Sequence, residues 1–80
     1  MTQVINQTVD INAFYFVGKE LKTFPRQIEY GGRAVTFGSG LRLRVEREGR
    51  SVFFFHMSAL DGETYKLRQD GDEWTLEGVL

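Results

Sequence analysis

Residues 41–56 read LRLRVEREGRSVFFFH, and this stretch decides the predicted fold. Apolar and charged residues alternate with a period of two on both sides of Glu48-Gly49, which is the pattern of two strands joined by a tight turn. A two-residue loop at Glu48-Gly49 sets Val45 opposite Val52 and Leu43 opposite Phe54. We expect one face to be buried and the other to carry arginines and aromatics. The predicted buried face holds Leu41, Leu43, Val45, Val52 and Phe54, with His56 opposite Leu41 at the edge of the core, and the opposite face holds Arg42, Arg44, Phe53 and Phe55.

Two further hairpins follow from glycine-containing turns. A loop at Asp70-Gly71 sets Leu67 opposite Trp74 and Tyr65 opposite Leu76, which makes one face wholly apolar. A loop at Gly31-Gly32 sets Ile28 opposite Val35 and Tyr30 opposite Arg33. Turns at short intervals between segments rich in Val, Ile, Phe, Tyr and Thr are typical of small all-β domains.

The fold class we predict is all-β, with six or seven short antiparallel strands in meander order forming a small barrel or sandwich. The segment 10–22 is open to two interpretations. Residues 13–23 form a fourth hairpin with a turn at Gly18-Lys19, or Asp10 caps a helix over 10–22 that packs on an antiparallel sheet. The density of aromatic and β-branched residues favours the strand, and a glycine inside a helix costs about 1 kcal/mol. Residues 1–8 are expected to be a frayed end or an edge strand.

The expected core combines the apolar faces of these hairpins. Its members are Phe14, Phe16, Leu21, Ile28, Val35, Phe37, Leu41, Leu43, Val45, Val52, Phe54, Tyr65, Leu67, Trp74 and Leu76.

Length and composition exclude several classes of protein. Eighty residues make one domain, 1–80, and the absence of cysteine excludes disulfides, thiolate metal sites and a cysteine nucleophile. A net charge of −1 excludes a chain-wide polycation that coats nucleic acid. No apolar run approaches the ~18 residues of a membrane span, and the N-terminus lacks the features of a signal peptide. The expected location is the cytoplasm.

Residues that carry catalytic chemistry are sparse. His56 is the single histidine, and one imidazole without cysteine partners makes neither a metal site nor a triad. The acidic residues cluster at turns, where carboxylates keep loops soluble. Glycine pairs such as Gly38-Ser39-Gly40 lack the Gly-Lys-Ser/Thr ending of a phosphate-binding loop. We therefore expect no enzyme activity, no cofactor and no metal.

One feature rises above this background, and we treat it as the candidate interaction face. Its residues are Arg42, Arg44, Phe53 and Phe55, with Arg33 and Arg47 beside them. Three interpretations stand: the phenylalanines lie inside the fold under the arginine stems, the face binds another protein or a second copy, or it binds single-stranded nucleic acid by stacking and phosphate contacts. The function we predict is a small non-enzymatic interaction module, a homodimer being its simplest form. Nucleic-acid binding through the same face is the alternative, and a membrane partner is not expected.

Overall fold

The computed structural model describes residues 2–80, which form seven strands and no helix. The strands are β1 (Gln3–Thr8), β2 (Asp10–Val17), β3 (Lys22–Tyr30), β4 (Arg33–Arg47), β5 (Arg50–Ala59), β6 (Thr64–Asp70) and β7 (Glu73–Val79). None of the described residues belongs to a helix long and apolar enough to cross a membrane.

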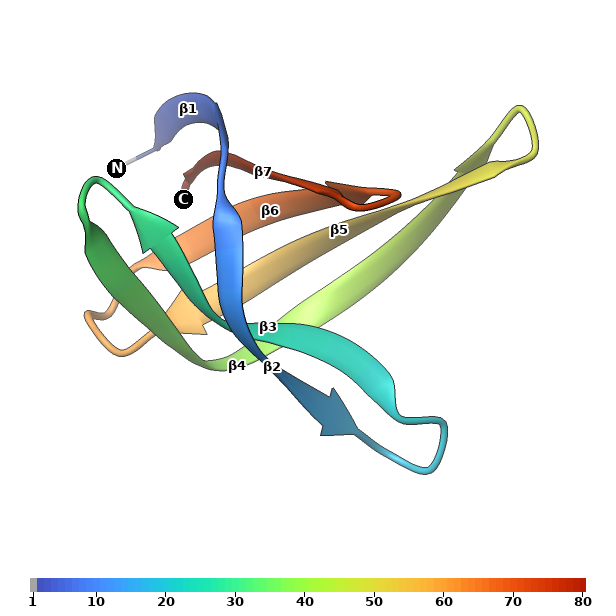
Figure 1. The fold of residues 1–80 in the computed structure, drawn as a ribbon, viewed down its shortest axis with the longest axis horizontal. Helices are drawn as coiled ribbons and strands as arrows, with labels where there is room; N and C mark the ends of the chain where they lie inside the picture. Colours follow the sequence, from blue (N-terminus) through green and yellow to red (C-terminus); the bar gives the residue numbers. More distant parts are fainter. Residues whose placement is uncertain (1) are drawn as a thin grey trace.

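All neighbouring strands are antiparallel, in the order β1-β7-β6-β5-β4-β3-β2. Strands β2 to β7 follow one another as a meander, and β1 pairs with β7 at the far end (Figure 1). The sheet is open, and β1 and β2 are its two end strands. Val9, which lies between them in the chain, is buried and donates its N–H to the carbonyl of Trp74 at 3.0 Å. The predicted all-β meander is confirmed, but it forms an open sheet instead of the expected small barrel or sandwich.

The longest strand, β4, changes partner along its length. Residues 33–36 pair with β3, whereas Phe37 and residues 39–47 pair with β5, and the β4–β5 register shifts between Phe37 and Ser39. At this point the Arg26 side chain of β3 donates to the carbonyl oxygen of Phe37 at 3.0 Å. Because β3 and β5 diverge here, β2 and β3 fold over one face of the remaining sheet (Figure 1).

The core lies between β2–β3 and the sheet that they cover. Its buried hydrophobic residues are Val9, Phe24, Ile28, Val35, Phe37, Phe55, Met57, Tyr65, Leu67, Trp74 and Leu76. Aromatic contacts join the two sides: Phe24 meets the edge of Phe55 at 5.9 Å between ring centroids, and Phe55 meets Trp74 at 5.1 Å. Such pairs add about 0.5–1.5 kcal/mol each beyond the area they bury.

Two of the predicted hairpin registers are confirmed. The β4–β5 pairing sets Leu43 opposite Phe54 and Val45 opposite Val52, and the β3–β4 pairing sets Ile28 opposite Val35. The β6–β7 loop is Gly71-Asp72 instead of Asp70-Gly71, so Leu67 lies opposite Leu76 and not opposite Trp74. The predicted β6–β7 register is therefore wrong by two residues. Because side chains alternate with a period of two, the faces are unchanged, and Tyr65, Leu67, Trp74 and Leu76 are buried as predicted.

The predicted buried face of the β4–β5 hairpin is wrong. Leu41 and Leu43 are 74% and 63% exposed, and Val45, Val52 and Phe54 are only half-buried. The opposite face supplies the core residues Phe55 and Met57 instead. The hairpin has apolar side chains on both faces, and β2–β3 cover the face that carries Phe55. The register was therefore right while the choice of face was inverted.

The N-terminal segment is a strand pair, and the helical alternative for 10–22 is wrong. Strand β2 pairs with β3 from Asp10 to Val17, with two register shifts around Ala13. The turn covers four residues, 18–21, instead of two, and Leu21 donates its N–H to the carbonyl of Gly18 at 3.1 Å. Phe16 and Leu21, expected in the core, are exposed because they lie at this projecting end of the molecule. Phe14, also expected in the core, is 44% exposed although its ring lies 5.9 Å from that of Trp74. For residues 1–8 the sequence predicted a frayed end or an edge strand. Within the described residues 2–8 the second alternative is correct, because Gln3–Thr8 form the edge strand β1.

Candidate functional site

The predicted interaction face is mostly turned towards the core. Phe55 is 1% exposed, and Phe53 is half-buried and packs against the core. The Arg42 guanidinium carbon lies 4.3 Å from the centroid of the Phe53 ring, so the arginine covers the edge of the core as a cation–π contact. Arg44 pairs with Glu46 and also reaches the Ser51 hydroxyl at 3.3 Å. The structure thus brings Arg42, Arg44 and Phe53 together and removes Phe55 from the surface.

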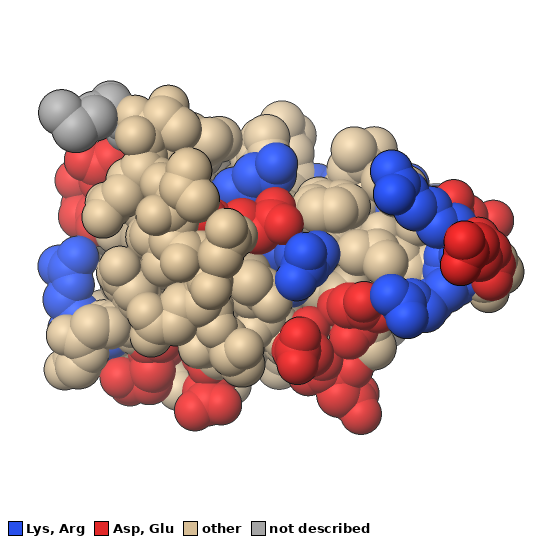
Figure 2. Space-filling view, turned by 90° about the horizontal axis from the view of Figure 1, so that it is seen from above, with Lys and Arg blue, Asp and Glu red and all other residues tan. Residues whose placement is uncertain are grey.

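The two flanking arginines do not join this face. Arg33 is the first residue of β4 and lines a groove with Asp61 and Tyr65, whereas Arg47 is the last residue of β4 and is exposed at the β4–β5 turn. The six residues therefore form no continuous basic surface. Figure 2 shows acidic and basic side chains interleaved over the charged end of the molecule.

A different surface stands out on the opposite side of the same hairpin. We define the outer stripe as Leu41, Leu43 and Val45 of β4 with Val52 and Phe54 of β5. These residues are exposed or half-buried, and they lie side by side because Leu43 pairs with Phe54 and Val45 with Val52. An open groove of about 610 Å³ follows four of them, Leu41, Leu43, Val45 and Phe54, and Arg42, His56 and Lys66 complete its lining. Its lining is mainly apolar, which is unusual for a solvent-facing sheet.

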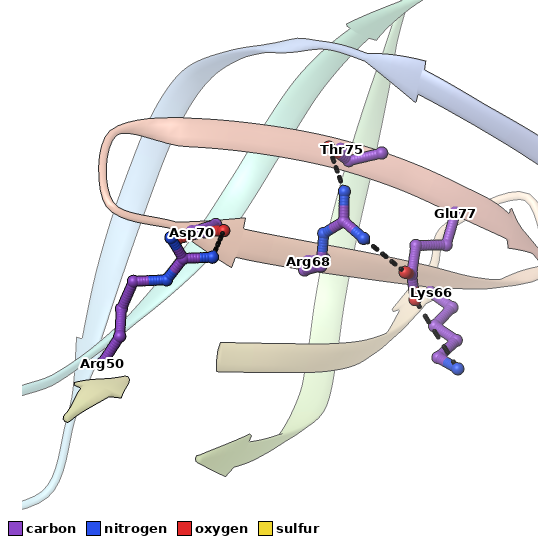
Figure 3. A network of polar contacts seen from close by, with 6 residues as sticks. All are labelled: Arg50, Lys66, Arg68, Asp70, Thr75 and Glu77. Atoms are coloured by element: carbon purple, nitrogen blue, oxygen red, sulfur yellow. Dashed lines mark hydrogen bonds and ion pairs between the residues drawn. The ribbon is translucent and has the colours of Figure 1, made fainter. Parts of the chain in front are cut away.

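Charged residues border the outer stripe along β6 and β7. Glu77 lies 3.6 Å from Lys66 and 3.5 Å from Arg68, and Arg50 donates to Asp70 at 2.7 Å (Figure 3). Arg68 also reaches the Thr75 hydroxyl at 3.4 Å. Surface ion pairs of this kind contribute roughly 0–1 kcal/mol each. Their effect is to neutralise this border, so that the apolar outer stripe is flanked by matched charges on one side only.

On its other side the outer stripe reaches an unpaired strand edge. From Gly40 to Arg47, β4 pairs only with β5 among the described strands, and we call this stretch the free edge. Glu48 and Gly49 both have positive φ, 51° and 76°, which makes the connection a two-residue type I′ turn. The residues that flank such a turn, Arg47 and Arg50, form a hydrogen-bonded pair. Counting back, Leu41, Leu43 and Val45 bond to β5, and the N–H and C=O groups of Arg42, Arg44 and Glu46 point outward.

The end strands of the sheet differ from this free edge. The β1–β7 ladder is broken between Val4 and Gln7, where Asn6 has a positive φ of 52°. The β2–β3 ladder has two register shifts within Ile11–Phe14. Bulges twist a strand edge and hinder pairing with another chain. The β4–β5 ladder from Ser39 to Arg47 has no shift, so the free edge of β4 is the regular one.

A further group of polar contacts surrounds Asp61 in the connection between β5 and β6. The Asp61 carboxylate accepts hydrogen bonds from the N–H of Glu63 at 2.8 Å and from the Tyr65 hydroxyl at 2.9 Å. The bond from Glu63, followed by that from Tyr65 and by the charge of Arg33, holds the pKa of Asp61 below its usual value, although desolvation opposes them. Burial raises the pKa of Tyr65. Residues 2–80 contain no group of three or more His, Asp or Glu side chains that could hold a metal ion.

The outer stripe and the free edge were not recognised as a surface from the sequence. A signal was available in β5 when the whole strand is considered. Residues 53, 55, 57 and 59 are Phe, Phe, Met and Ala, whereas the other face becomes polar at His56 and Ser58. The longer apolar row is the buried one, and the shorter row that ends at His56 is the exposed one.

The fold and this surface define a small all-β domain with an exposed apolar sheet face. No family model, curated protein or solved structure matches the chain.

Proposed function

We propose that the protein is a non-enzymatic interaction module that binds a protein partner through the outer stripe and the adjoining free edge of β4. The observation that carries this proposal is the coincidence of an apolar face with a regular unpaired strand edge on one hairpin. The proposal keeps the interaction function that the sequence suggested and moves it to the opposite face. The proposed location is the cytoplasm, in line with a chain that has no cysteine.

Energetic arguments support this surface. Leu41 and Leu43 expose most of their side chains, and burying an exposed leucine is worth roughly 1.5–3 kcal/mol. A regular edge also offers backbone hydrogen bonds to any extended segment laid beside it. Affinity would come from the edge and specificity from the alternate side chains, as in other partners that add a strand to a sheet.

Site-specific photo-crosslinking tests the proposal. A photoreactive amino acid replaces Leu43 within the outer stripe, and in a matched control it replaces Asp72, which is exposed at the β6–β7 turn. We expect adducts at position 43 that are absent at position 72. Mass spectrometry identifies the captured chain, and the purified partner is then titrated against the wild type and Leu43→Ser. We expect at least a tenfold loss of affinity in the variant. Equal adducts at the two positions, or unchanged affinity in Leu43→Ser, would contradict the proposal.

Nucleic-acid binding remains the second proposal, supported by the Arg42 guanidinium stacked on Phe53. The support is smaller because Phe55 is covered and because Arg44, Arg50 and Arg68 lie beside carboxylates. Fluorescence anisotropy with a mixed pool of short single-stranded oligonucleotides at low salt tests it. Binding that weakens steeply with salt and is lost in Arg42→Gln would support this second function. No binding at low salt would end it.

A further inference from the structure

We propose that the partner of the free edge is a second copy of this chain, paired antiparallel through β4 with the two-fold axis at Arg44. This inference rests on the proposed function and names its partner. The two sheets would join edge to edge, and the two outer stripes would lie on the same face of the joined sheet.

The backbone supplies the first argument. The outward N–H and C=O groups of the free edge belong to Gly40, Arg42, Arg44 and Glu46, so residues of even number form the hydrogen-bonded pairs with an added strand. A register centred on Arg44 pairs Arg44 with itself and Arg42 with Glu46 of the second copy. It extends from residue 41 to residue 47 and therefore uses nearly the whole free edge.

Charge complementarity supplies the second argument. In this register each Arg42 faces Glu46 of the second copy, which gives two opposite-charge pairs related by the two-fold axis. Arg42 belongs to no ion pair among the described residues, and its Nε atom is buried without a hydrogen-bond partner. The two central Arg44 side chains each retain Glu46 of their own chain. The strand is thus complementary to itself at Arg42, which has no ion pair among the described residues of the single chain.

Apolar contacts agree with the same register. Leu43 lies opposite Val45 of the second copy, and Val45 lies opposite Leu43, on the exposed face. Side chains directly opposite each other in an antiparallel pair have Cβ atoms roughly 4.5–5.5 Å apart. Both residues are at least partly exposed in the single chain, so the pairing would remove apolar surface from water at its centre.

The neighbouring registers are less favourable. A register centred on Leu43 sets Arg42 against Arg44 in both halves, and like charges directly opposite destabilise a sheet. A register centred on Val45 shortens the paired stretch to residues 43–47 and leaves Arg42 outside the ladder. The register centred on Arg44 is therefore the one that combines length, charge and apolar contact.

A charge-reversal series measured by sedimentation equilibrium tests the pairing. Arg42→Glu and Glu46→Arg are each expected to weaken dimerisation about tenfold or more, because each replaces two attractive pairs by two repulsive ones. The double variant Arg42→Glu/Glu46→Arg restores opposite charges and is expected to recover most of the affinity. Lys22→Glu, an exposed position on β3, is the control with the same charge change as Arg42→Glu. Single variants that dimerise like the wild type would overturn the proposal.

Cysteine crosslinking tests the register directly, because the chain has no cysteine of its own. A hydrogen-bonded pair places the two Arg44 Cα atoms about 5.5 Å apart, within the range that a disulfide spans. Oxidation of Arg44→Cys with copper phenanthroline should give a covalent dimer. In Leu43→Cys the two thiols lie on a diagonal of about 7–8 Å, so crosslinking should be much slower. Equal rates in the two variants, or a faster rate in Leu43→Cys, would overturn the register.

The outcomes separate this inference from the proposed function. A wild-type chain that stays monomeric at every concentration overturns the homodimer. If position 43 then still captures a different protein whose affinity depends on Leu43, the interaction function stands without it. If position 43 captures nothing and the chain is monomeric, both proposals fail.

Discussion

Three consecutive phenylalanines, residues 53–55, lie in three different environments. Phe55 contacts Phe24 and Trp74 in the core, Phe53 lies under Arg42 at the core margin, and Phe54 faces solvent with Lys66 5.7 Å from its ring. We expect Phe55→Ala to lower the free energy of unfolding by about 3–5 kcal/mol, as for other buried phenylalanines, and Phe54→Ala to lower it much less. Urea unfolding of both variants measures this. A larger loss of unfolding free energy in Phe54→Ala than in Phe55→Ala would contradict this assignment. It would indicate that Phe54 is the buried residue, as the sequence alone predicted.

Asp61 adds a pH dependence at the scale of one residue. Its pKa is lowered from 3.8 chiefly by the hydrogen bond from the Glu63 N–H, so the folded protein favours the ionised carboxylate. The resulting stabilisation is complete above the unfolded value and is lost as the pH falls through the lower, folded one. Asp61→Asn should therefore be less stable than the wild type at pH 6, and the difference should shrink below about pH 4. Thermal melts across this range, with Asp72→Asn as control, measure it. A difference that is constant with pH would contradict this role.

At the scale of the element, the two glycines of β4, Gly38 and Gly40, have different surroundings. A Cβ on Gly40 would collide with the Met57 side chain and come within 2.8 Å of the His56 carbonyl oxygen. A Cβ on Gly38 would meet Leu60 at 3.6 Å, an ordinary contact. Gly40→Ala should cost about 1–3 kcal/mol of stability through overpacking, and Gly38→Ala should cost clearly less. Equal unfolding midpoints in urea for the two variants would show that β4 and Met57 do not approach as described.

Hairpin register was predictable because it is set locally. Gly31-Gly32 and Glu48-Gly49 supply adjacent residues with positive φ, and a two-residue turn fixes which residues are opposite. The four-residue turn at 18–21 was missed because Leu21 adopts a positive φ of 52° that its residue type does not signal. Turn chemistry therefore predicts the register of these two hairpins. It fails at 18–21, and it misplaces the β6–β7 loop by one residue although Gly71 has a positive φ of 61° there.

The face of a hairpin is set by contacts distant in sequence. Leu43 and Phe54 are as apolar as Phe53 and Phe55, so a period of two alone cannot choose between the two faces. The choice follows from the divergence of β3 and β5 at Phe37, which lays Phe24 over Phe55. The arginines of the predicted interaction face were located in the correct strand and register, but the surface that they were thought to present is the covered one.

For the whole molecule, the consequence is a sheet in which β4 leaves a regular edge unpaired from Gly40 to Arg47 among the described strands. Bulges interrupt β1 and β2 at the two ends, whereas the free edge of β4 continues an uninterrupted ladder beside an apolar face. Composition could predict neither the edge nor its location, because both arise where β4 leaves β3. The near-zero net charge is compatible with association between copies, because two chains that each carry a net charge of −1 repel each other only weakly.

Amide hydrogen exchange along β4, followed by NMR at several protein concentrations, tests the central claim most directly. In the single chain the N–H groups of Leu41, Leu43 and Val45 bond to β5 and should exchange slowly at every concentration. Those of Arg42, Arg44 and Glu46 point outward and should exchange fast when dilute and slowly when concentrated, as the second copy pairs with the free edge. Fast exchange of these three amides at every concentration would contradict the pairing of β4 with itself.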